Sequence, residues 1–269
     1  MIYKAKTTEL LRLLLGDRTT SWLHALRYWW LLHTRAANEV DMLFIPLLVG
    51  EGDIVIDIGA NSADWTWRLS KQVGNRGKVY SFEADPYYAN VTQKVIRLLG
   101  LRNVEFFSYG LSDRSGSAVL RIRTPDNHRV VGTGHIVEAT DENYTGDHQT
   151  VRVRIAPLDE VPEIKPYAKS IRLIKCDVEG HELHVLRGAV NVLERSRPVV
   201  IAEVGHTGYQ IDNERQIFAF FERLDYDPFV VGLDNRSLTK SQPGDRFLVG
   251  TRPNRILIPR EKSGLLRSW

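Results

Sequence analysis

The sequence predicts an α/β protein with a Rossmann-like, mostly parallel β-sheet and helices on both of its faces. From residue 54 onward, short apolar runs of strand length alternate with longer segments of helical periodicity. This alternation places consecutive strands side by side in a parallel sheet, with the helices packed across them. The first run contains Asp57 and the second ends on Glu83. Carboxylates at these positions are typical of a ligand crevice at the carboxyl edge of such a sheet.

Seven segments are predicted to form the strands of the sheet, and the last two are expected to pair antiparallel. They span residues 54–58, 78–83, 104–109, 170–178, 199–204, 228–232 and 247–251. The predicted helices span residues 63–73, 86–99, 181–193 and 213–224. Residues 118–122 and 151–155 alternate in polarity and are expected to form a separate hairpin.

The chain is expected to have three parts. Residues 1–48 have no strand pattern and are predicted to form an N-terminal helical cap or lid. Residues 49–251 form the sheet-containing domain, in which the polar stretch 124–150 is interpreted as an insertion near the substrate site. Residues 252–269 contain five basic residues and one acidic residue, and a solvated basic tail is expected there.

The charge and composition of the chain bear on its binding partners and on its location in the cell. The 269 residues carry a net charge of +3, which is too small to indicate a nucleic-acid partner. Cys176 is the single cysteine, so no intrachain disulfide can form. No apolar run has the length of a membrane span, and a cytoplasmic protein is therefore expected.

The N-terminal part is rich in leucine and tryptophan. A leucine cluster ends at Gly16, and a second predicted helix carries Trp22, Trp29 and Trp30 together with arginines. The tryptophans either pack on the core, or they form a lid or an interfacial anchor. The second alternative would give the protein peripheral contact with a membrane.

A nucleoside-binding turn is predicted at the end of the first strand. Gly59, Ala60 and Asn61 follow that strand, and Glu83 lies one strand–helix–strand unit later. Backbone amides of such a turn face the ligand, while the carboxylate accepts hydrogen bonds from ribose hydroxyls. The further glycines of a dinucleotide site are missing, which favours S-adenosylmethionine over NAD. Asp57 is expected to face the cofactor's ammonium group or to hold the turn.

Catalytic residues are predicted at the ends of the fourth and fifth strands. Lys175 and Asp177 alternate onto one face, so an ion pair is expected to keep Asp177 deprotonated as a base. His206 is the alternative base, because its ordinary pKa suits proton transfer near neutral pH. Asp177 and His206, with Glu203, could also hold a divalent cation. No spacing rule supports this, and no metal is expected.

Three further residues are candidates for contact with the substrate. Glu179 follows Asp177 by two positions, and Glu203 ends the fifth strand. His135 lies between Gly134 and Ile136 in the polar insertion.

Six motifs in order resemble the FkbM-type methyltransferases, and the resemblance covers roughly residues 39–205. They are Val-Ile-Asp-Ile-Gly-Ala-Asn at 55–61, Phe-Glu-Ala-Asp-Pro at 82–86, Leu-Ser-Asp at 111–113, Leu-Asp-Glu-Val at 158–161, Ile-Lys-Cys-Asp-Val-Glu-Gly-His-Glu at 174–182 and Pro-Val-Val-Ile-Ala-Glu at 198–203. The resemblance implies a class I, S-adenosylmethionine-dependent fold and O-methylation of a sugar or natural-product hydroxyl. The acceptor is then a small molecule or a glycan.

The resemblance also implies roles for individual positions. The loop on the methionine side of the cofactor is matched by Asp57, Gly59, Ala60 and Asn61, and the ribose-binding segment by Glu83 and Ala84. The segment on the adenine side is matched by Gly110, Leu111 and Ser112, and the family's paired acids are matched by Asp177 and Glu179. One position departs from the family, because Ala63 stands where its turn usually has a second glycine.

Three alternatives to this function remain open. The same fold serves methyltransferases that act on nucleic acid or protein, although the chain lacks a dense basic stripe. A non-catalytic protein that binds the cofactor is the second alternative. An NAD-dependent enzyme is the third, and the missing glycines disfavour it.

Overall fold

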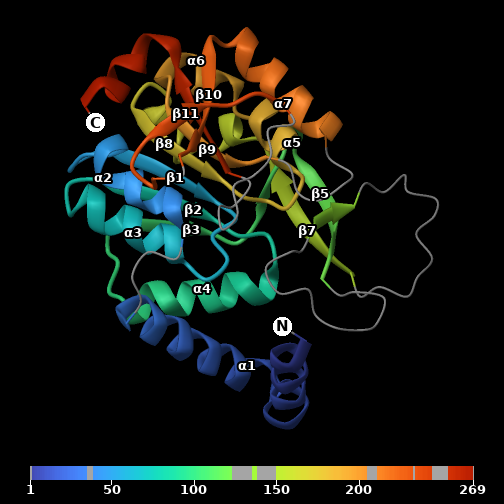
Figure 1. The fold of residues 1–269 in the computed structure, drawn as a ribbon. Helices are drawn as coiled ribbons and strands as arrows, with labels where there is room; N and C mark the ends of the chain where they lie inside the picture. Colours follow the sequence, from blue (N-terminus) through green and yellow to red (C-terminus); the bar gives the residue numbers. More distant parts are fainter. Residues whose placement is uncertain are drawn as a thin grey trace.

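The structure is a computed structural model, shown in Figure 1. It describes residues 2–34, 39–122, 135–137, 150–204, 211–232, 234–243 and 254–268, with side chains left out at 2–14, 135–137, 211–212 and 265–268. Among these residues, no helix is long and apolar enough to cross a membrane.

The main sheet has eight strands in the order β11-β10-β12-β9-β8-β1-β2-β3. The strands are β1 (Ile54–Ile58), β2 (Lys78–Phe82), β3 (Val104–Phe107), β8 (Ile171–Cys176), β9 (Val199–Glu203), β10 (Tyr226–Val231), β11 (Leu238–Lys240) and β12 (Asn254–Pro259). The five strands from β9 to β3 are parallel, and β12 runs antiparallel between β9 and β10. The predicted seven-stranded, mostly parallel sheet is confirmed, and the short β11 extends its edge.

The strand order reverses between β1 and β8. From β1 the chain adds β2 and β3 on one side, and then crosses back to place β8 on the other side. Crossover connections therefore leave a crevice outside the carboxyl ends of these two strands, which is where open α/β sheets bind ligands. The candidate site is therefore expected in this crevice.

Helices cover both faces of the sheet (Figure 1). One face packs against α5 (Glu182–Arg187), α6 (Val190–Ser196) and α7 (Ile211–Arg223). The other face packs against α3 (Asp64–Val73), α2 (Ile45–Leu48) and the 3₁₀ turn η1 (Val40–Phe44). Along β1, Val55 points to the second face and Ile56 to the first, as strand alternation requires. One helix was predicted over residues 181–193, whereas the structure has two, α5 and α6.

A smaller sheet contains the predicted hairpin. Its order is β4-β7-β5-β6, from β4 (Gly110–Leu111), β5 (Gly116–Arg121), β6 (His135–Val137) and β7 (Thr150–Ala156). Strands β5 and β7 pair antiparallel along their length, which confirms the hairpin. Most of the predicted insertion, residues 124–150, lies outside the described residues.

The N-terminal part is helical, as predicted. Helix α1 (Ile2–Thr34) is kinked at Gly16, which has a φ of 74°. Glycine adopts this left-handed conformation with little strain because it has no Cβ. The second half of α1 packs along α4 (Pro86–Leu98), where Ala25 and Leu32 meet Val91 and Val95. In Figure 1 α1 lies outside α4, on the side away from the sheet.

The interpretation of residues 252–269 as a solvated tail is wrong for β12. All six residues of Asn254–Pro259 are buried. The charge that suggested a tail includes Arg255, which is 1% exposed and whose Nη2 lies 3.1 Å from the Glu214 carboxylate of α7. The charge of Arg255, which is buried and paired, thus made a core strand resemble a solvated tail in the sequence. The strand that the sequence predicts at residues 247–251 lies outside the described residues.

Candidate active site

The turn after β1 is held against the ends of β2 and β8. Gly59 has a φ of 83°, and a Cβ built on it would lie 1.9 Å from the backbone oxygen of Asp177. The N–H groups of Gly59 and Ala60 donate to the Phe82 oxygen at 3.0 and 2.9 Å. Any side chain at Gly59 would therefore force β1 and β8 apart at the crevice. Ala63 also has a left-handed φ, 66°, which explains why a glycine is usual there.

Glu83 lies directly beside this turn. Its carboxylate accepts hydrogen bonds from the N–H of Asn61 and the N–H of Asp85, both at 2.8 Å. Burial raises the pKa of Glu83 to about 7, although the two backbone donors oppose the shift. The carboxylate is half-buried, so it combines a fixed position with access to a ligand. Ala84 is the next residue, and its Cβ would come within 3.2 Å of a Cβ at Gly110.

Asp57 lies beneath the turn and is 1% exposed. It accepts a short hydrogen bond, 2.5 Å, from the Thr66 hydroxyl, and that hydroxyl also meets Ser81 at 2.9 Å. Burial raises the pKa of Asp57 to about 6. This carboxyl therefore ties the end of β1 to α3 and β2.

Lys175 is the centre of a buried polar network. Its Nζ lies 3.3 Å from Asp177 Oδ2, so the predicted ion pair is present, and 3.0 Å from Asn254 Oδ1 in β12. Asn254 in turn donates to Asp41 at 2.7 Å. Burial lowers the pKa of Lys175, but nearby carboxylates, Asp177 foremost, outweigh it and raise the pKa above its ordinary value. Lys175 is therefore charged at neutral pH.

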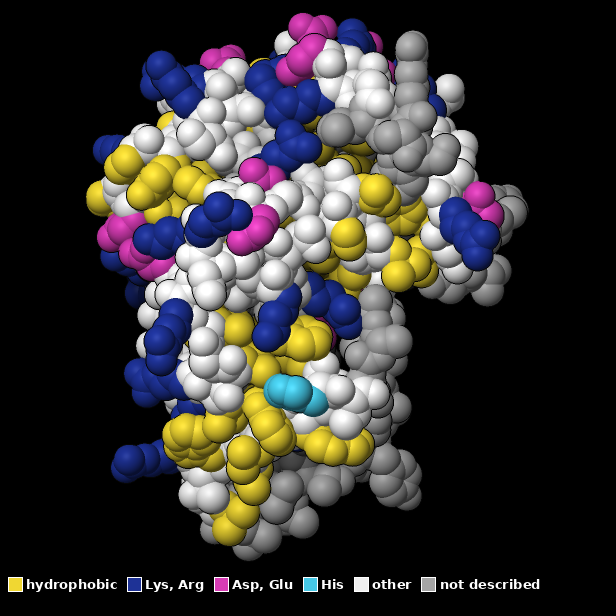
Figure 2. All heavy atoms as spheres, turned by 90° about the vertical axis from the view of Figure 1, so that its left-hand side faces the viewer, with side chains coloured by type: hydrophobic (Ala, Val, Ile, Leu, Met, Phe, Trp, Pro, Cys, Tyr) yellow, Lys and Arg dark blue, Asp and Glu magenta, His cyan; other side chains and the backbone are white. Residues whose placement is uncertain are grey.

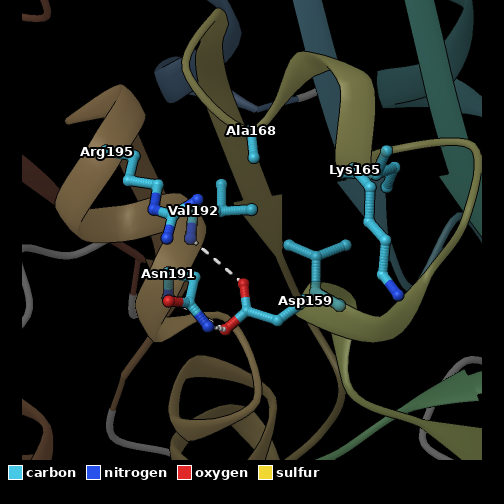
Figure 3. A pocket seen from close by; sticks show the side chains of 8 residues that line it. Asp159, Lys165, Ala168, Asn191, Val192 and Arg195 are labelled. Atoms are coloured by element: carbon cyan, nitrogen blue, oxygen red, sulfur yellow. Dashed lines mark hydrogen bonds between the residues drawn. The ribbon is translucent and has the colours of Figure 1, made fainter.

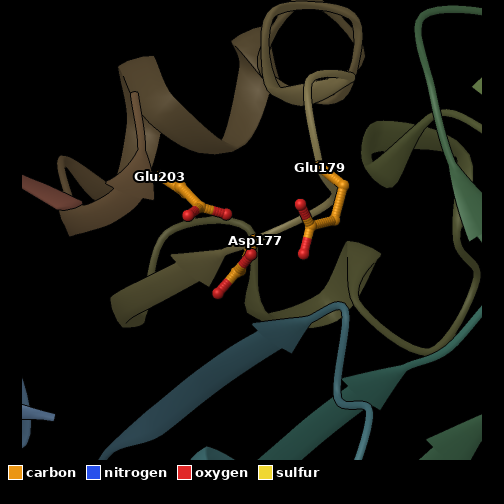
Figure 4. Close-up of side chains that lie close together, drawn as sticks. All are labelled: Asp177, Glu179 and Glu203. Atoms are coloured by element: carbon orange, nitrogen blue, oxygen red, sulfur yellow. The ribbon is translucent and has the colours of Figure 1, made fainter. Parts of the chain in front are cut away.

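Three acidic side chains meet at the carboxyl ends of β8 and β9 (Figure 4). Carboxylate oxygens of Asp177, Glu179 and Glu203 lie within 4.8 Å of one another. Burial and a hydrogen bond with Asp177 raise the pKa of Glu203 to about 10, so this carboxyl holds a proton at neutral pH. Such a cluster can accept hydrogen bonds from hydroxyl groups, face a cationic ligand or supply oxygens to a hard divalent cation.

The loop that carries Glu179 has a defined backbone. Glu179 and Gly180 have left-handed φ values of 55° and 101°. The Glu182 carboxylate fixes them by accepting from the N–H groups of Val178 and Gly180 at 3.0 and 3.1 Å. Glu182 and Gly180 both belong to the 174–182 motif, so the motif encodes the shape of the loop as well as its charges.

His181 connects this loop to the predicted adenine-side segment. Its Nε2 lies 2.9 Å from the hydroxyl of Ser112, which is fully buried after Leu111 at the end of β4. Its ring stacks on His184 at 4.6 Å, and His184 Nδ1 lies 2.7 Å from Asp113 Oδ2. Burial and the neighbouring His184 lower the pKa of His181 to about 4, so the imidazole is neutral.

The structure thus brings together the two groups of residues that the sequence singled out. The turn at 59–61, Glu83 and the acids of the 177–179 segment converge at the β1–β8 crevice. His206 and the side chain of His135 lie outside the described residues. His181 was not predicted from the sequence, although its place in the 174–182 motif was a signal. Asp41 and Asn254 were not predicted either, and a linear pattern offers no signal for them.

A separate hollow of about 300 Å³ lies away from this crevice (Figure 3). Its polar wall includes Asp159, Lys165 and Arg195. The Asp159 carboxylate accepts from the N–H groups of Asn191 and Val192, and so caps the start of α6. The residues that line the hollow share no member with the acidic cluster.

The chain matches the family described as "Methyltransferase FkbM domain" over residues 57–228. It is 27% identical over 208 residues to the hexuronic acid methyltransferase AglP of Haloferax volcanii, covering 76% of this chain and 72% of AglP.

Two solved structures are similar at lower identity. One is the methyltransferase FkbM from Methylobacillus flagellatus, with 15% identity, a TM-score of 0.46, and coverage of 77% of this chain and 43% of that one. The other is a SAM-dependent O-methyltransferase from Thermotoga maritima, with 16% identity and a TM-score of 0.42. That similarity covers 81% of this chain and 63% of the Thermotoga maritima chain.

Proposed function

Since the chain belongs to the methyltransferase FkbM family, we propose that it is an S-adenosylmethionine-dependent O-methyltransferase acting on a hydroxyl of a sugar. The observation that carries this proposal is the Glu83 carboxylate, fixed by two backbone donors beside the turn after β1. A half-buried carboxylate at that place suits the vicinal hydroxyls of a ribose. The nucleic-acid and protein alternatives have no comparable observation in their favour.

The charge of the crevice supports a cationic cofactor. Asp177 and Glu179 face it from the loop after β8, and Lys175, near the end of β8, pairs with Asp177. The sulfonium and ammonium groups of S-adenosylmethionine are both positive, and they would find complementary charge here. When bound, this cofactor supplies an activated methyl group. The residues proposed to line its site are Gly59, Ala60, Asn61, Glu83, Ala84, Gly110 and Asp177. Asp57, Leu111 and Ser112 are buried and are proposed to support this site from behind.

A sugar acceptor fits the acidic cluster. Carboxylate oxygens accept hydrogen bonds from hydroxyls, and the protonated Glu203 can also donate one. Glu179 and Glu203 are therefore proposed to orient the acceptor. The similarity to a hexuronic acid methyltransferase supports a sugar among possible acceptors. His135 stays a proposed substrate contact on sequence grounds alone.

Asp177 is proposed as the base that takes the acceptor's proton. Lys175 lies 3.3 Å from its carboxylate and favours the deprotonated form. Glu203 is less suited to this role, because burial and its hydrogen bond with Asp177 raise its pKa and favour its protonated form. Positioning of the acceptor oxygen then supplies much of the rate acceleration. His206 stays the alternative base.

The cofactor can be tested by calorimetric titration with S-adenosylhomocysteine, with NAD as the competing ligand. We expect micromolar binding of the former and none of the latter. Glu83→Ala should weaken binding at least about tenfold, since a bidentate ribose contact is lost. Glu194→Ala, an exposed position on α6, is the matched control and should bind as the wild type does. Binding of NAD, or unchanged affinity in Glu83→Ala, would contradict the proposal.

The acceptor is tested separately, with labelled S-adenosylmethionine and a panel of neutral and acidic sugars. Transfer of label to a sugar hydroxyl is the expected result. Cofactor binding with transfer to protein or RNA, and none to any glycan, would overturn the sugar assignment and leave the cofactor assignment intact.

A further inference from the structure

Helix α1 exposes an apolar face on the side away from α4. Its exposed large side chains are Leu15, Trp22, Leu23, Leu26, Trp29 and Trp30. Trp30 is 57% exposed and Leu26 46%. The buried side of the same helix holds Ala25 and Leu32 against α4. A helix that is apolar on both sides needs a second partner to cover the outer one.

Helical spacing gathers these side chains into one stripe. Trp22, Leu26 and Trp29 follow one another by four and three positions, and Leu23 and Trp30 by seven. Residues at these spacings lie on one face of a helix. In Figure 2 the lower part of the molecule, where α1 lies, presents a broad apolar surface.

Basic side chains border this apolar stripe. Arg18 and Arg27 are exposed on α1, and helical geometry places them at opposite edges of the stripe. Lys94 of α4 holds its Nζ 5.3 Å from the centre of the Trp22 ring. Burial and the positive charges of Arg18 and Arg97 lower the pKa of Lys94. Lys94 is buried, and its ammonium also donates to the Ser21 hydroxyl. Arg18 and Arg97 are exposed and lie close enough to repel this ammonium. An anionic ligand would relieve this repulsion.

We propose that α1 binds the surface of an anionic lipid bilayer. The apolar stripe would enter the boundary between headgroups and acyl chains, and the basic border would meet lipid phosphates. Tryptophan favours this boundary because its ring is apolar while its N–H finds polar partners.

The place of α1 suits an enzyme that works at such a surface. His24, midway along the second half of α1, lies 2.9 Å from the hydroxyl of Tyr87 in the first turn of α4. That turn directly follows Glu83 and Asp85 at the carboxyl edge of the sheet. The proposed membrane face is therefore tied to the edge that carries the candidate site.

The test is flotation with vesicles of phosphatidylcholine alone and of phosphatidylcholine with about one third phosphatidylglycerol. We expect the protein to partition onto the anionic vesicles at least about tenfold more strongly than onto the neutral ones. Trp29→Ser with Trp30→Ser should reduce this binding about tenfold. Separately, Arg18→Gln with Arg97→Gln should reduce it about 25-fold, given roughly fivefold for each basic residue.

Matched controls alter the same residue types elsewhere. Leu43→Ser with Leu47→Ser removes exposed leucines outside α1, and Lys165→Gln with Arg195→Gln removes cations of the separate hollow. Both should float like the wild type, and circular dichroism checks that every variant is folded. Failure of the wild type to float on anionic vesicles overturns the proposal, as do test variants that float normally. A dimer in light scattering that Trp29→Ser with Trp30→Ser abolishes would instead assign the face to self-association.

Discussion

The Nζ of Lys175 lies 3.0 Å from Oδ1 of Asn254, so a lysine of β8 is held by a residue 79 positions later in the chain. The same asparagine donates to Asp41, which places one amide between an N-terminal carboxylate and the ion pair of Lys175 with Asp177. Lys175, the partner of the proposed base, is therefore held by a network whose members lie 213 positions apart in the chain.

Substitution of Asn254 tests this relationship. Asn254→Ala leaves buried polar atoms of Lys175 and Asp41 without this partner, and should lower the free energy of unfolding by about 1–3 kcal/mol. It should also reduce kcat more than it weakens binding of S-adenosylhomocysteine, because Asn254 contacts Lys175 rather than the cofactor turn. Denaturant titration, steady-state rates and calorimetry measure the three effects. Gln93→Ala, exposed on α4, should change none of them, and equal losses in kcat and affinity would contradict the assignment.

The two acids Asp177 and Glu203 should respond differently to replacement by their amides. Glu203 holds a proton at neutral pH, so Glu203→Gln keeps its shape and donor capacity and should retain activity within about fivefold. Asp177→Asn removes the proposed base and should lower kcat about 10²–10⁴-fold, with the cofactor still bound. Rate measurements beside calorimetry distinguish these outcomes. A severe loss in Glu203→Gln with normal rates in Asp177→Asn would reverse the roles.

Glu83 should make ligand binding depend on pH. Its pKa of about 7 means that half of the carboxyls are protonated near neutrality. Ribose hydroxyls donate to the charged form, so affinity for S-adenosylhomocysteine should rise as the pH increases to about 8 and then level off. Calorimetry across this range should show no such rise in Glu83→Gln. A rise that persists in this variant would assign the titration to another group.

Glu83 should also contribute to the pH dependence of stability. Its folded pKa of about 7 lies above the ordinary value of 4.5, so the folded protein holds this proton more tightly than the unfolded chain does. The resulting stability is fully present below pH 4.5 and is lost as the pH rises through about 7. Since the group is half-buried, we expect a loss of about 1–2 kcal/mol. Denaturant titrations should show a flatter profile in Glu83→Gln, and an unchanged profile would contradict this origin.

The buried pair of Arg255 and Glu214 tests the position of β12. Arg255→Ala would leave the Glu214 carboxylate buried without this guanidinium, and should cost about 3–5 kcal/mol of stability. Arg255→Met combined with Glu214→Leu should restore most of that loss, because no buried charge then remains at the pair. Chemical denaturation of the three proteins measures this. Arg260→Ala removes ion pairs with the exposed Asp225 and the partly exposed Asp227, and should cost less than about 1 kcal/mol.

The sequence predicted those parts of the site whose residues lie close together in the chain. The turn at 59–61 and Glu83 belong to one strand–helix–strand unit, so sequence spacing alone brings them together. The pairing of Lys175 with Asp177 follows from strand alternation in the same way.

The remainder depends on contacts between distant segments. Asn254 reaches Asp41 across 213 positions, and no periodicity encodes that distance. The basic residues around β12 concealed its apolar run, because the partner that allows Arg255 to be buried lies on α7. The break between α5 and α6 falls at Gly188, where a Cβ would lie 2.0 Å from the backbone oxygen of Ser112. Close tertiary approach, rather than helix propensity, ends that helix.

The position of β12 also sets an order of events for a chain leaving the ribosome. Strands β9 and β10 emerge before β12, yet β12 lies between them in the finished sheet. While residues 254–259 are still being made, β9 has no antiparallel neighbour and β10 cannot take its final place. Until then Lys175 also lacks Asn254. A nascent chain that already contains every motif of the crevice therefore cannot yet hold its central lysine in the catalytic arrangement.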